Sequence, residues 1–487
     1  MDRRVAQGHP PDSPADRPTD RWIDHPVELA VGLGLVVLAL GAYLLTGAVR
    51  SYDPYYTHFL WQAEAFLHGR AAIDFPVTAV AGSIGNDLFN DVMPLPGGGA
   101  LLPFPPLPAI VLMPFVAIWG LATNDQIIAA VLGAIDVAIA WWMLGRLRVS
   151  LGSRVATTLF FALGTVIWYA AELGTTWFFA HLVAVAFALL AVGVAIGRDP
   201  DSVRDEDELP EAGDETEATT RRSPRQWLAA VDRWQLLAGF LLGLAATARL
   251  PVVLGAPFFV LVGGGGSWVR RAVSAGIGAA VPVGALLVYN LAASGAPMHA
   301  AYDYQYRLEA TGYPSLGYHD DWGIEDPRYL PQNVGIALLS PPVLFPDTVP
   351  RALGGEPLCT DPDAKRGLFD ETCPLLLPPD TGMSLFLTSP AYLLAIPALR
   401  LLYGRSRLVT GAALAVLVIA VFDLMHFSQG WVQFGWRFSN DFVPFALPLV
   451  ALGIERLRHR PVVVAAFVAA SVAVNLWGVM WGTMLGW

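Results

Sequence analysis

The chain has 487 residues, of which 55% are hydrophobic and 15% are charged. A soluble domain carries about 25% charged residues, so this composition excludes an ordinary soluble protein and indicates a protein that crosses a membrane several times. The net charge of -11 argues against nucleic acid as a partner.

The chain divides into a short N-terminal segment and one membrane domain. Residues 1–26 are rich in Pro and Asp and contain no apolar run, so we expect a disordered cytoplasmic N-terminus that is not a cleavable signal. Residues 27–487 are predicted to form an all-α polytopic membrane protein with about 11–12 transmembrane helices. The twelve apolar segments are 27–49, 101–119, 126–145, 155–171, 175–197, 235–249, 250–263, 272–293, 384–399, 408–427, 441–455 and 461–484.

Arginine-rich loops predict the orientation of these segments in a plasma membrane, because short positive loops stay in the cytoplasm. Four such loops lie at 146–154, 270–271, 400–407 and 456–460, and we place them inside.

Three longer loops complete this topology. Residues 50–100 and 294–383 are predicted to be outside, and the second of these loops contains 13 acidic and five basic residues. Segment 198–233, with ten acidic residues between 199 and 217, is predicted to be a disordered cytoplasmic loop.

One segment conflicts with this topology. Only one crossing is allowed between the outer loop 50–100 and the inner loop 146–154, yet two apolar segments lie between them. Segment 101–119 contains five prolines, and proline costs about 3 kcal/mol inside a helix. We therefore expect 101–119 to be re-entrant or to cross only partly; the alternative is that 146–154 is external.

The two cysteines of the chain, Cys359 and Cys373, lie in the loop 294–383. If this loop faces an oxidising compartment, the two residues are expected to form a disulfide, and the alternative is two free thiols.

The stretch "SYDPYYTHFLWQAEAFLHGR", residues 51–70, follows the first apolar segment. Asp53 as N-cap and Pro54 as first helical residue predict the start of an amphipathic helix that lies at the outer membrane surface. Asp53 is then either a cap alone or a carboxylate at the water–lipid boundary that deprotonates an acceptor hydroxyl or holds a metal ion.

Other polar residues fall on the same predicted side of the membrane. Glu172 lies between two apolar segments, and Arg249, Arg437 and Asp441 lie in or beside outer turns. His181 follows Glu172 by nine residues, at the start of a span. Arginine is the natural partner of a phosphate. The alternatives are a snorkelling role for Arg437 and a helix–helix hydrogen bond for His181.

Two acidic residues lie inside spans. Asp136 and Asp423 are functional candidates by default, but the sequence assigns them no role. The chain contains no Gly-rich phosphate loop, Walker motif, zinc-ligand spacing or nucleophile elbow. ATP-driven transport and metalloprotease chemistry therefore lack support.

Several passages resemble the GT-C superfamily of membrane glycosyltransferases, especially bacterial and archaeal proteins related to protein O-mannosyltransferases and lipid A aminoarabinose transferases. The passages are "SYDPYYTHFLWQAEAFLHGR", "LLPFPPLPAIVLMPFVAIWG", "LLAGFLLGLAATARLPVVLGAPFFVL", "GMSLFLTSPAYLLAIPAL" and "QFGWRFSNDFVPFALPLVALGI". The resemblance covers most of residues 27–455.

The resemblance implies a GT-C-like fold and the transfer of a sugar, with inversion, from a polyprenyl-phosphate carrier to a lipid, glycan or protein acceptor on the outer face. It implies that Asp53 is catalytic, that Glu172 is a second acid and that Arg249 or Arg437 binds the lipid phosphate. Many members carry a second acid directly after the first, where this chain has Pro54. No metal site is therefore predicted, although a divalent cation is left open.

The candidate site residues form two groups. The predicted catalytic residues are Asp53 and Glu172. The predicted substrate-binding residues are Tyr56, His58, His181, Arg249, Arg437 and Asp441. The loop 294–383, with Tyr302, Tyr304, Tyr306 and Trp322, is expected to cover the site; its aromatic residues either stack on sugars or form an interfacial belt.

A transporter or lipid flippase is the alternative function. A transporter is expected to place its polar residues near the middle of the membrane and to show two related halves.

Overall fold

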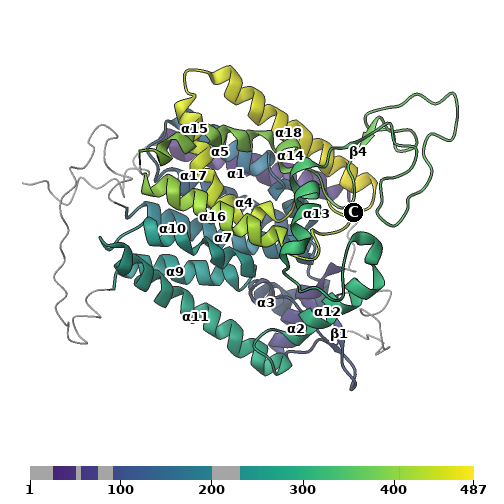
Figure 1. Cartoon of the computed structure of the whole chain (residues 1–487), viewed down its shortest axis with the longest axis horizontal. Helices are drawn as coiled ribbons and strands as arrows, with labels where there is room; N and C mark the ends of the chain where they lie inside the picture. The colour runs from purple at the N-terminus through teal and green to yellow at the C-terminus, as the bar shows by residue number, and fades with distance from the viewer. Residues whose placement is uncertain (1–25, 51–55, 75–90, 200–230, 405) are drawn as a thin grey trace, which may run out of the picture.

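The computed structural model describes residues 26–50, 56–74, 91–199, 231–404 and 406–487. These residues form a bundle of helices that run roughly side by side, horizontally in Figure 1. The end drawn on the right carries α12, the short strands and the C-terminal residue; we call it the loop-rich end, and it comprises residues 56–74, 91–104, 296–383 and 425–438. Predicted segments 1–26 and 198–233 lie almost entirely outside the described residues.

The elements are bounded as follows. The α-helices are α1 (Pro26–Ala48), α2 (His58–Leu67), α3 (Leu107–Trp119), α4 (Asp125–Leu144), α5 (Leu151–Leu163), α6 (Ile167–Leu173), α7 (Thr176–Ile196), α9 (Arg233–Ala246), α10 (Ala256–Leu261), α11 (Trp268–Ser294), α12 (Ala300–Gly312), α13 (Leu330–Val334), α14 (Leu385–Thr388), α15 (Ile396–Leu399), α16 (Arg407–Leu424), α17 (Ser439–Arg456) and α18 (Pro461–Met484). The 3-10 helices are η3 (Gly120–Ala122), η5 (Leu250–Gly255), η6 (Pro314–Leu316), η7 (Pro327–Tyr329), η9 (Pro390–Ala395) and η10 (Arg400–Leu402), and η8 (Gly335–Leu339) is a π-helix.

Two small antiparallel sheets lie in the loops of the loop-rich end. Strands β1 (Met93–Pro94) and β2 (Ala100–Leu101) pair with Met93 opposite Leu101. Strands β3 (Val343–Leu344) and β4 (Leu376–Leu377) pair with Val343 opposite Leu377.

The helices confirm the predicted all-α, multi-span architecture. Among the described residues, six helices are long and apolar enough to cross a membrane, namely α1, α4, α7, α11, α16 and α18. The pair α5 and α6, bent by 46°, forms a seventh candidate span. The other predicted segments fall on shorter apolar helices and on α17. The 18 residues of α17 are mostly buried, and they include the charged residues Asp441, Glu455 and Arg456.

The helix α3 is short, as its prolines predict. With η3 it comprises residues 107–122, which span about 24 Å at 1.5 Å per residue, less than the roughly 30 Å hydrocarbon core of a bilayer. It contains Pro114 and packs against α2 at the loop-rich end. This geometry favours the prediction that segment 101–119 does not fully cross the membrane.

The helix predicted in the first outer loop is present, but it begins later than the sequence suggests. The structure starts α2 at His58 with Thr57 in the N-cap position, so Asp53 is not its cap. The physical reason lies in α7, where the Thr176 hydroxyl donates to the Tyr56 carbonyl at 2.6 Å and accepts from the His58 amide at 3.2 Å. These bonds fix the backbone on both sides of Thr57, so that α2 begins at His58.

Close contact between α9 and α11 depends on glycine. A Cβ atom on Gly278 would lie 2.0 Å from the carbonyl oxygen of Leu236, and one on Gly239 would lie 2.0 Å from that of Ala275. Small residues let helix backbones approach in this way in membranes. A side chain at either position would force the two helices apart.

Cys359 and Cys373 are joined by a disulfide in the loop-rich end. The described part of the chain contains no free cysteine. The bond closes a loop with a sequence separation of 14 residues, between the strands β3 and β4.

The contact between α9 and α11 can be tested with a matched pair of glycine substitutions. We expect Gly278→Ala to destabilise the protein by about 1–3 kcal/mol, because overpacking forces the backbones to move. Gly276→Ala in the same helix is the control, since a Cβ atom at Gly276 would meet nothing within 4 Å. The measurement is the thermal unfolding midpoint of the purified protein in detergent. Equal midpoints for the two variants would contradict the glycine-dependent contact.

Candidate active site

A buried ion pair with a third partner lies where α7, α9 and α17 meet. Asp441, in the first turn of α17, accepts hydrogen bonds from Arg249 Nε at 3.2 Å and from Arg249 Nη2 at 2.8 Å. Its Oδ1 also lies 3.0 Å from His181 Nδ1 in α7. The side chains of His181 and Asp441 are 0% exposed, whereas that of Arg249 is 22% exposed. Three predicted site residues are therefore brought into direct contact.

Arg437 lies next to this ion pair on the segment that precedes α17. The guanidinium carbons of Arg437 and Arg249 lie 5.3 Å and 5.1 Å from the centre of the Phe438 ring. In the described part of the chain no ion pair involves Arg437, and its buried Nε has no hydrogen-bond partner. Burial and the charge of Arg249 lower the pKa of Arg437 to about 10, so the side chain stays protonated at neutral pH.

Two carboxyl groups face Arg437 from the loops. Asp91 precedes β1, and Glu309 lies in α12, where its Oε1 accepts a hydrogen bond from Gln305 Nε2 at 2.8 Å. Burial raises the pKa of Asp91 to about 6, while Arg437, Gln305 and Trp177 oppose the shift. Burial and the charge of Asp91 raise the pKa of Glu309 to about 8. At neutral pH the pair therefore carries about one negative charge.

Sequence reasoning missed this carboxyl pair. Asp91 and Glu309 are more than 200 positions apart, and neither lies in a passage that carries the family resemblance. The available signal was the i, i+4 spacing of Gln305 and Glu309, which places both on one face of a helix. Asp91 itself adopts a left-handed backbone with φ 56°, a conformation that costs free energy and is common at functional sites.

Glu172 is already paired with another residue. Arg50 donates to its Oε1 at 2.9 Å through Nη2 and to its Oε2 at 3.4 Å through Nε. Arg50 also donates to the carbonyl oxygen of Trp487. Because Glu172 is 0% exposed and bound to Arg50, its geometry suits a structural ion pair, and its catalytic role stays a prediction.

Tyr56 and His58 lie against the N-terminal turn of α7. The Tyr56 ring packs edge-on against Trp177 at 5.2 Å between centroids. His58 is fully buried, and its Nδ1 lies 2.9 Å from the Thr176 hydroxyl. Both residues therefore help to fix α2 against α7, and their predicted contact with substrate stays untested.

Asp53 lies outside the described residues, so its position relative to Arg437 is open. Asp136 and Asp423 are buried in α4 and α16; both oxygens of Asp136 and Oδ2 of Asp423 have no hydrogen-bond partner in the described part of the chain. Among the described residues no group of three or more His, Cys, Asp or Glu side chains is placed to hold a metal ion.

The loop 294–383 packs onto residues 426–427, at the start of the segment that carries Arg437. The ring of Tyr302 stacks on His426 at 6.2 Å with an interplanar angle of 13°. Tyr306 packs against Phe427 and belongs to a small core at this end, together with Tyr318 and Tyr329. Of the four aromatic residues named from the sequence, Tyr306 belongs to this core and Trp322 packs against it. Their part in sugar stacking or in an interfacial belt stays a prediction.

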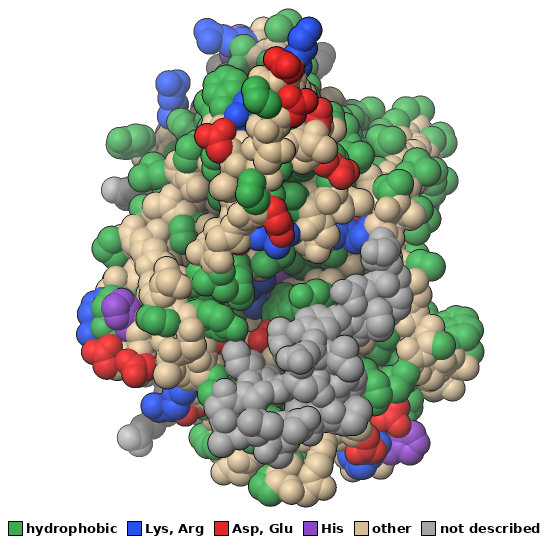
Figure 2. Space-filling view, turned by 90° about the vertical axis from the view of Figure 1, so that its right-hand side faces the viewer, with side chains coloured by type: hydrophobic (Ala, Val, Ile, Leu, Met, Phe, Trp, Pro, Cys, Tyr) green, Lys and Arg blue, Asp and Glu red, His purple; other side chains and the backbone are tan. Residues whose placement is uncertain are grey.

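The face of the loop-rich end is hollowed at its centre. Figure 2 shows Lys or Arg side chains, in blue, recessed there between green hydrophobic side chains. The arrangement offers an anion a positively charged, partly dry surface with carboxyl groups nearby.

No family model and no curated protein sequence matches the chain. Two solved structures of the Archaeoglobus fulgidus oligosaccharyltransferase are similar at 12% sequence identity: the apo form with a TM-score of 0.43, and AglB in complex with an inhibitory peptide and a dolichol-phosphate with a TM-score of 0.44. Each comparison covers 96% of this chain and 56% of the other, so the chain spans little more than half the length of these proteins.

The role of Asp441 in stability can be tested by removing its charge. We expect Asp441→Asn to cost about 3–5 kcal/mol, because it leaves Arg249 partly buried without a counter-charge. The control is Asp303→Asn, which breaks an exposed pair with Arg307 and is expected to cost at most about 1 kcal/mol. Both are measured by thermal unfolding in detergent; a loss as small for Asp441→Asn as for the control would contradict the assignment.

The carboxyl pair predicts a pH dependence of stability. Because the folded-state pKa of Glu309 is raised to about 8, the folded protein holds a proton that the unfolded chain releases near pH 4.3. Stability should therefore fall as pH rises from about 4 to 8. We expect Glu309→Gln to flatten this fall, and to raise the unfolding midpoint at pH 8 by about 2 °C or more. The control Asp303→Asn should keep the wild-type dependence of stability on pH. The same dependence in Glu309→Gln would contradict a raised pKa of Glu309 in the folded protein.

Proposed function

We propose that the protein is an integral-membrane glycosyltransferase that moves a sugar from a polyprenyl-phosphate carrier to an acceptor at the loop-rich end, with inversion. The observation that carries the proposal is Arg437: a protonated, partly buried guanidinium in the loop-rich end, with no anionic partner bonded to it in the described part of the chain. The family resemblance of the sequence around Asp53, Arg249 and Arg437 supports the same reaction.

The charges of the site suit a phosphate leaving group. When the bond between sugar and phosphate breaks, negative charge grows on the phosphate, and a fixed guanidinium stabilises that charge. Arg249 is already bonded to Asp441, whereas the Nε of Arg437 has no hydrogen-bond partner in the described part of the chain, so Arg437 is the guanidinium that remains available to the phosphate. The side chain of Arg249 is 22% exposed, so its N–H groups can add hydrogen bonds to the phosphate.

A carboxylate must take the proton of the attacking hydroxyl. Asp53 is the first candidate because of its sequence context. Asp91 is the second, because its raised pKa of about 6 makes it a stronger base than an ordinary aspartate and still leaves it ionised at neutral pH. Glu172 ranks below both, since Arg50 already occupies its carboxylate.

The alternative, a transporter or flippase, has one observation in its favour. Asp136 lies in the middle of α4, is 0% exposed and has no hydrogen-bond partner for either oxygen among the described residues. Buried acids of this kind can relay protons in transporters. Loss of lipid translocation in proteoliposomes on Asp136→Asn, without any sugar transfer by the wild type, would favour this alternative.

The direct test is transfer of radiolabelled sugar from a panel of polyprenyl-phosphate donors to endogenous or supplied acceptors. We expect Arg437→Ala to lower kcat/KM by 100-fold or more, and Arg437→Lys to recover only part of it, because lysine lacks the planar pair of donors. Asp53→Asn and Asp91→Asn separate the two candidate bases. The control is Arg458→Ala, an exposed arginine after α17 at the opposite end. Full activity of Arg437→Ala would refute the assignment.

A further inference from the structure

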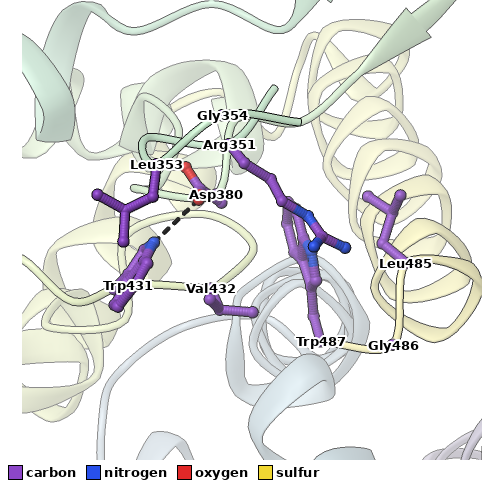
Figure 3. Close-up of a pocket in the computed structure, with 9 residues that line it drawn as sticks. All are labelled: Arg351, Leu353, Gly354, Asp380, Trp431, Val432, Leu485, Gly486 and Trp487. Carbon is purple, nitrogen blue, oxygen red and sulfur yellow. Dashed lines mark hydrogen bonds between the residues drawn. The ribbon is translucent and has the colours of Figure 1, made fainter. Parts of the chain in front are cut away.

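A pocket separate from the Arg249–Asp441 ion pair lies in the loop-rich end, with a volume of about 250 Å³. Figure 3 shows that the loop residues Arg351 and Leu353, the segment of Trp431 and Val432, and the last residues of the chain surround it. None of these residues carries an assigned role.

The pocket contains a buried acid that is held in a fixed orientation. Asp380 is 3% exposed. Its Oδ2 accepts a hydrogen bond from Trp431 Nε1 at 3.0 Å, drawn as a dashed line in Figure 3, and both oxygens accept from the Ala352 amide at 3.1 Å. The Thr381 amide is a third donor to this carboxylate. Carboxylate oxygens have about four acceptor sites between them, so capacity remains for one hydroxyl group of a ligand.

A buried donor lines the pocket as well. Trp487 is 6% exposed, and its indole Nε1 is buried without a hydrogen-bond partner in the described part of the chain. A buried polar group left unpaired costs about 1–3 kcal/mol, so its presence points to a ligand or solvent partner. In Figure 3 the Trp487 ring lies along the side chain of Arg351, which is 40% exposed.

The remaining surface is apolar and partly aromatic. Trp431 and Trp487 present indole rings, and Leu353, Val432 and Leu485 complete the walls. Val432 adopts φ 54°, which is a strained backbone conformation for a β-branched residue. The surrounding structure must hold this conformation in place. The resulting bend in the backbone at Val432 lets Trp431 and Val432 both line the pocket.

These features select a class of ligand. A free phosphate would meet the buried acid Asp380, and an acyl chain would leave Asp380 and Trp487 Nε1 without polar partners. A neutral sugar ring has C–H faces that pack on indole rings and a rim of hydroxyls that donate to a carboxylate and accept from guanidinium and indole N–H groups. We propose that this pocket binds one neutral pyranose ring of a glycan acceptor.

Two features link the pocket to the proposed active site: a shared segment of the chain and a set of hydrogen bonds made by Arg50. Trp431 and Arg437 lie on the same segment before α17, and Arg50 links the carbonyl oxygen of Trp487 to the carboxylate of Glu172. A sugar bound in this pocket would therefore contact the same backbone segment that carries Arg437. The acceptor role rests on the proposed transferase function, whereas sugar binding does not.

The binding experiment uses the full chain in nanodiscs and no donor. The probes are methyl α-mannoside, methyl β-glucoside and N-acetylglucosamine at millimolar concentrations, observed by saturation-transfer NMR. We expect at least one probe to bind the wild type, and Asp380→Asn and Leu353→Trp to weaken binding tenfold or more. Leu353→Trp fills the pocket from an exposed loop position, so it tests the site without removing a buried bond.

Matched controls are Asp347→Asn, an exposed acid of the same loop, and Trp268→Ala, an exposed tryptophan of α11. Both should bind like the wild type. Absence of binding by all three sugars, unchanged binding in Leu353→Trp, or preferential binding of inorganic phosphate would each overturn the sugar pocket.

The acceptor role has its own readout in the transfer assay with a glycan acceptor. We expect Leu353→Trp to raise KM for the acceptor about tenfold while kcat stays within twofold. An unchanged KM together with intact sugar binding would overturn the acceptor role alone. A wild type that binds sugars but transfers none would instead contradict the proposed function and leave the pocket standing.

Discussion

The contact of Asp441 with Arg249 and His181 is the interaction on which the loop-rich end depends. A charge buried in a membrane bundle is expensive unless it is paired and hydrogen-bonded. Asp441 meets this condition by binding Arg249 with both oxygens and by facing His181 at 3.0 Å. Because the three residues come from α17, the turn after α9 and α7, their contact fixes the ends of three helices relative to one another.

This arrangement leaves Arg437 as a guanidinium that forms no ion pair in the described part of the chain. Its neighbour Arg249 is compensated by Asp441, and the two carboxyl groups that influence its pKa, Asp91 and Glu309, carry about one charge between them at neutral pH. A guanidinium in this position gains most from a ligand that brings a negative charge. The proposed binding site for a phosphate thus combines residues of α12, the first loop and the segment before α17.

The same segment before α17 connects the proposed active site with the second pocket. Its residues His426 and Phe427 pack against α12, Trp431 holds Asp380, and Arg437 faces the carboxyl pair. The aromatic core beneath α12 keeps the loop 294–383 over this segment. A single irregular stretch therefore carries both Arg437, the proposed partner of the leaving group, and a wall of the proposed sugar pocket.

The sequence by itself determined the membrane class and the twelve apolar segments, and it singled out His181, Arg249, Arg437 and Asp441 as candidates, because hydropathy and rare charges in apolar surroundings are local properties. Only the tertiary structure decided how these charges pair. Glu172 binds Arg50, and Thr176 delays the start of α2, through contacts between residues more than 100 positions apart. The carboxyl pair and the Trp431–Asp380 pocket arise in the same way, since side chains from distant loops become neighbours only when the helices have packed.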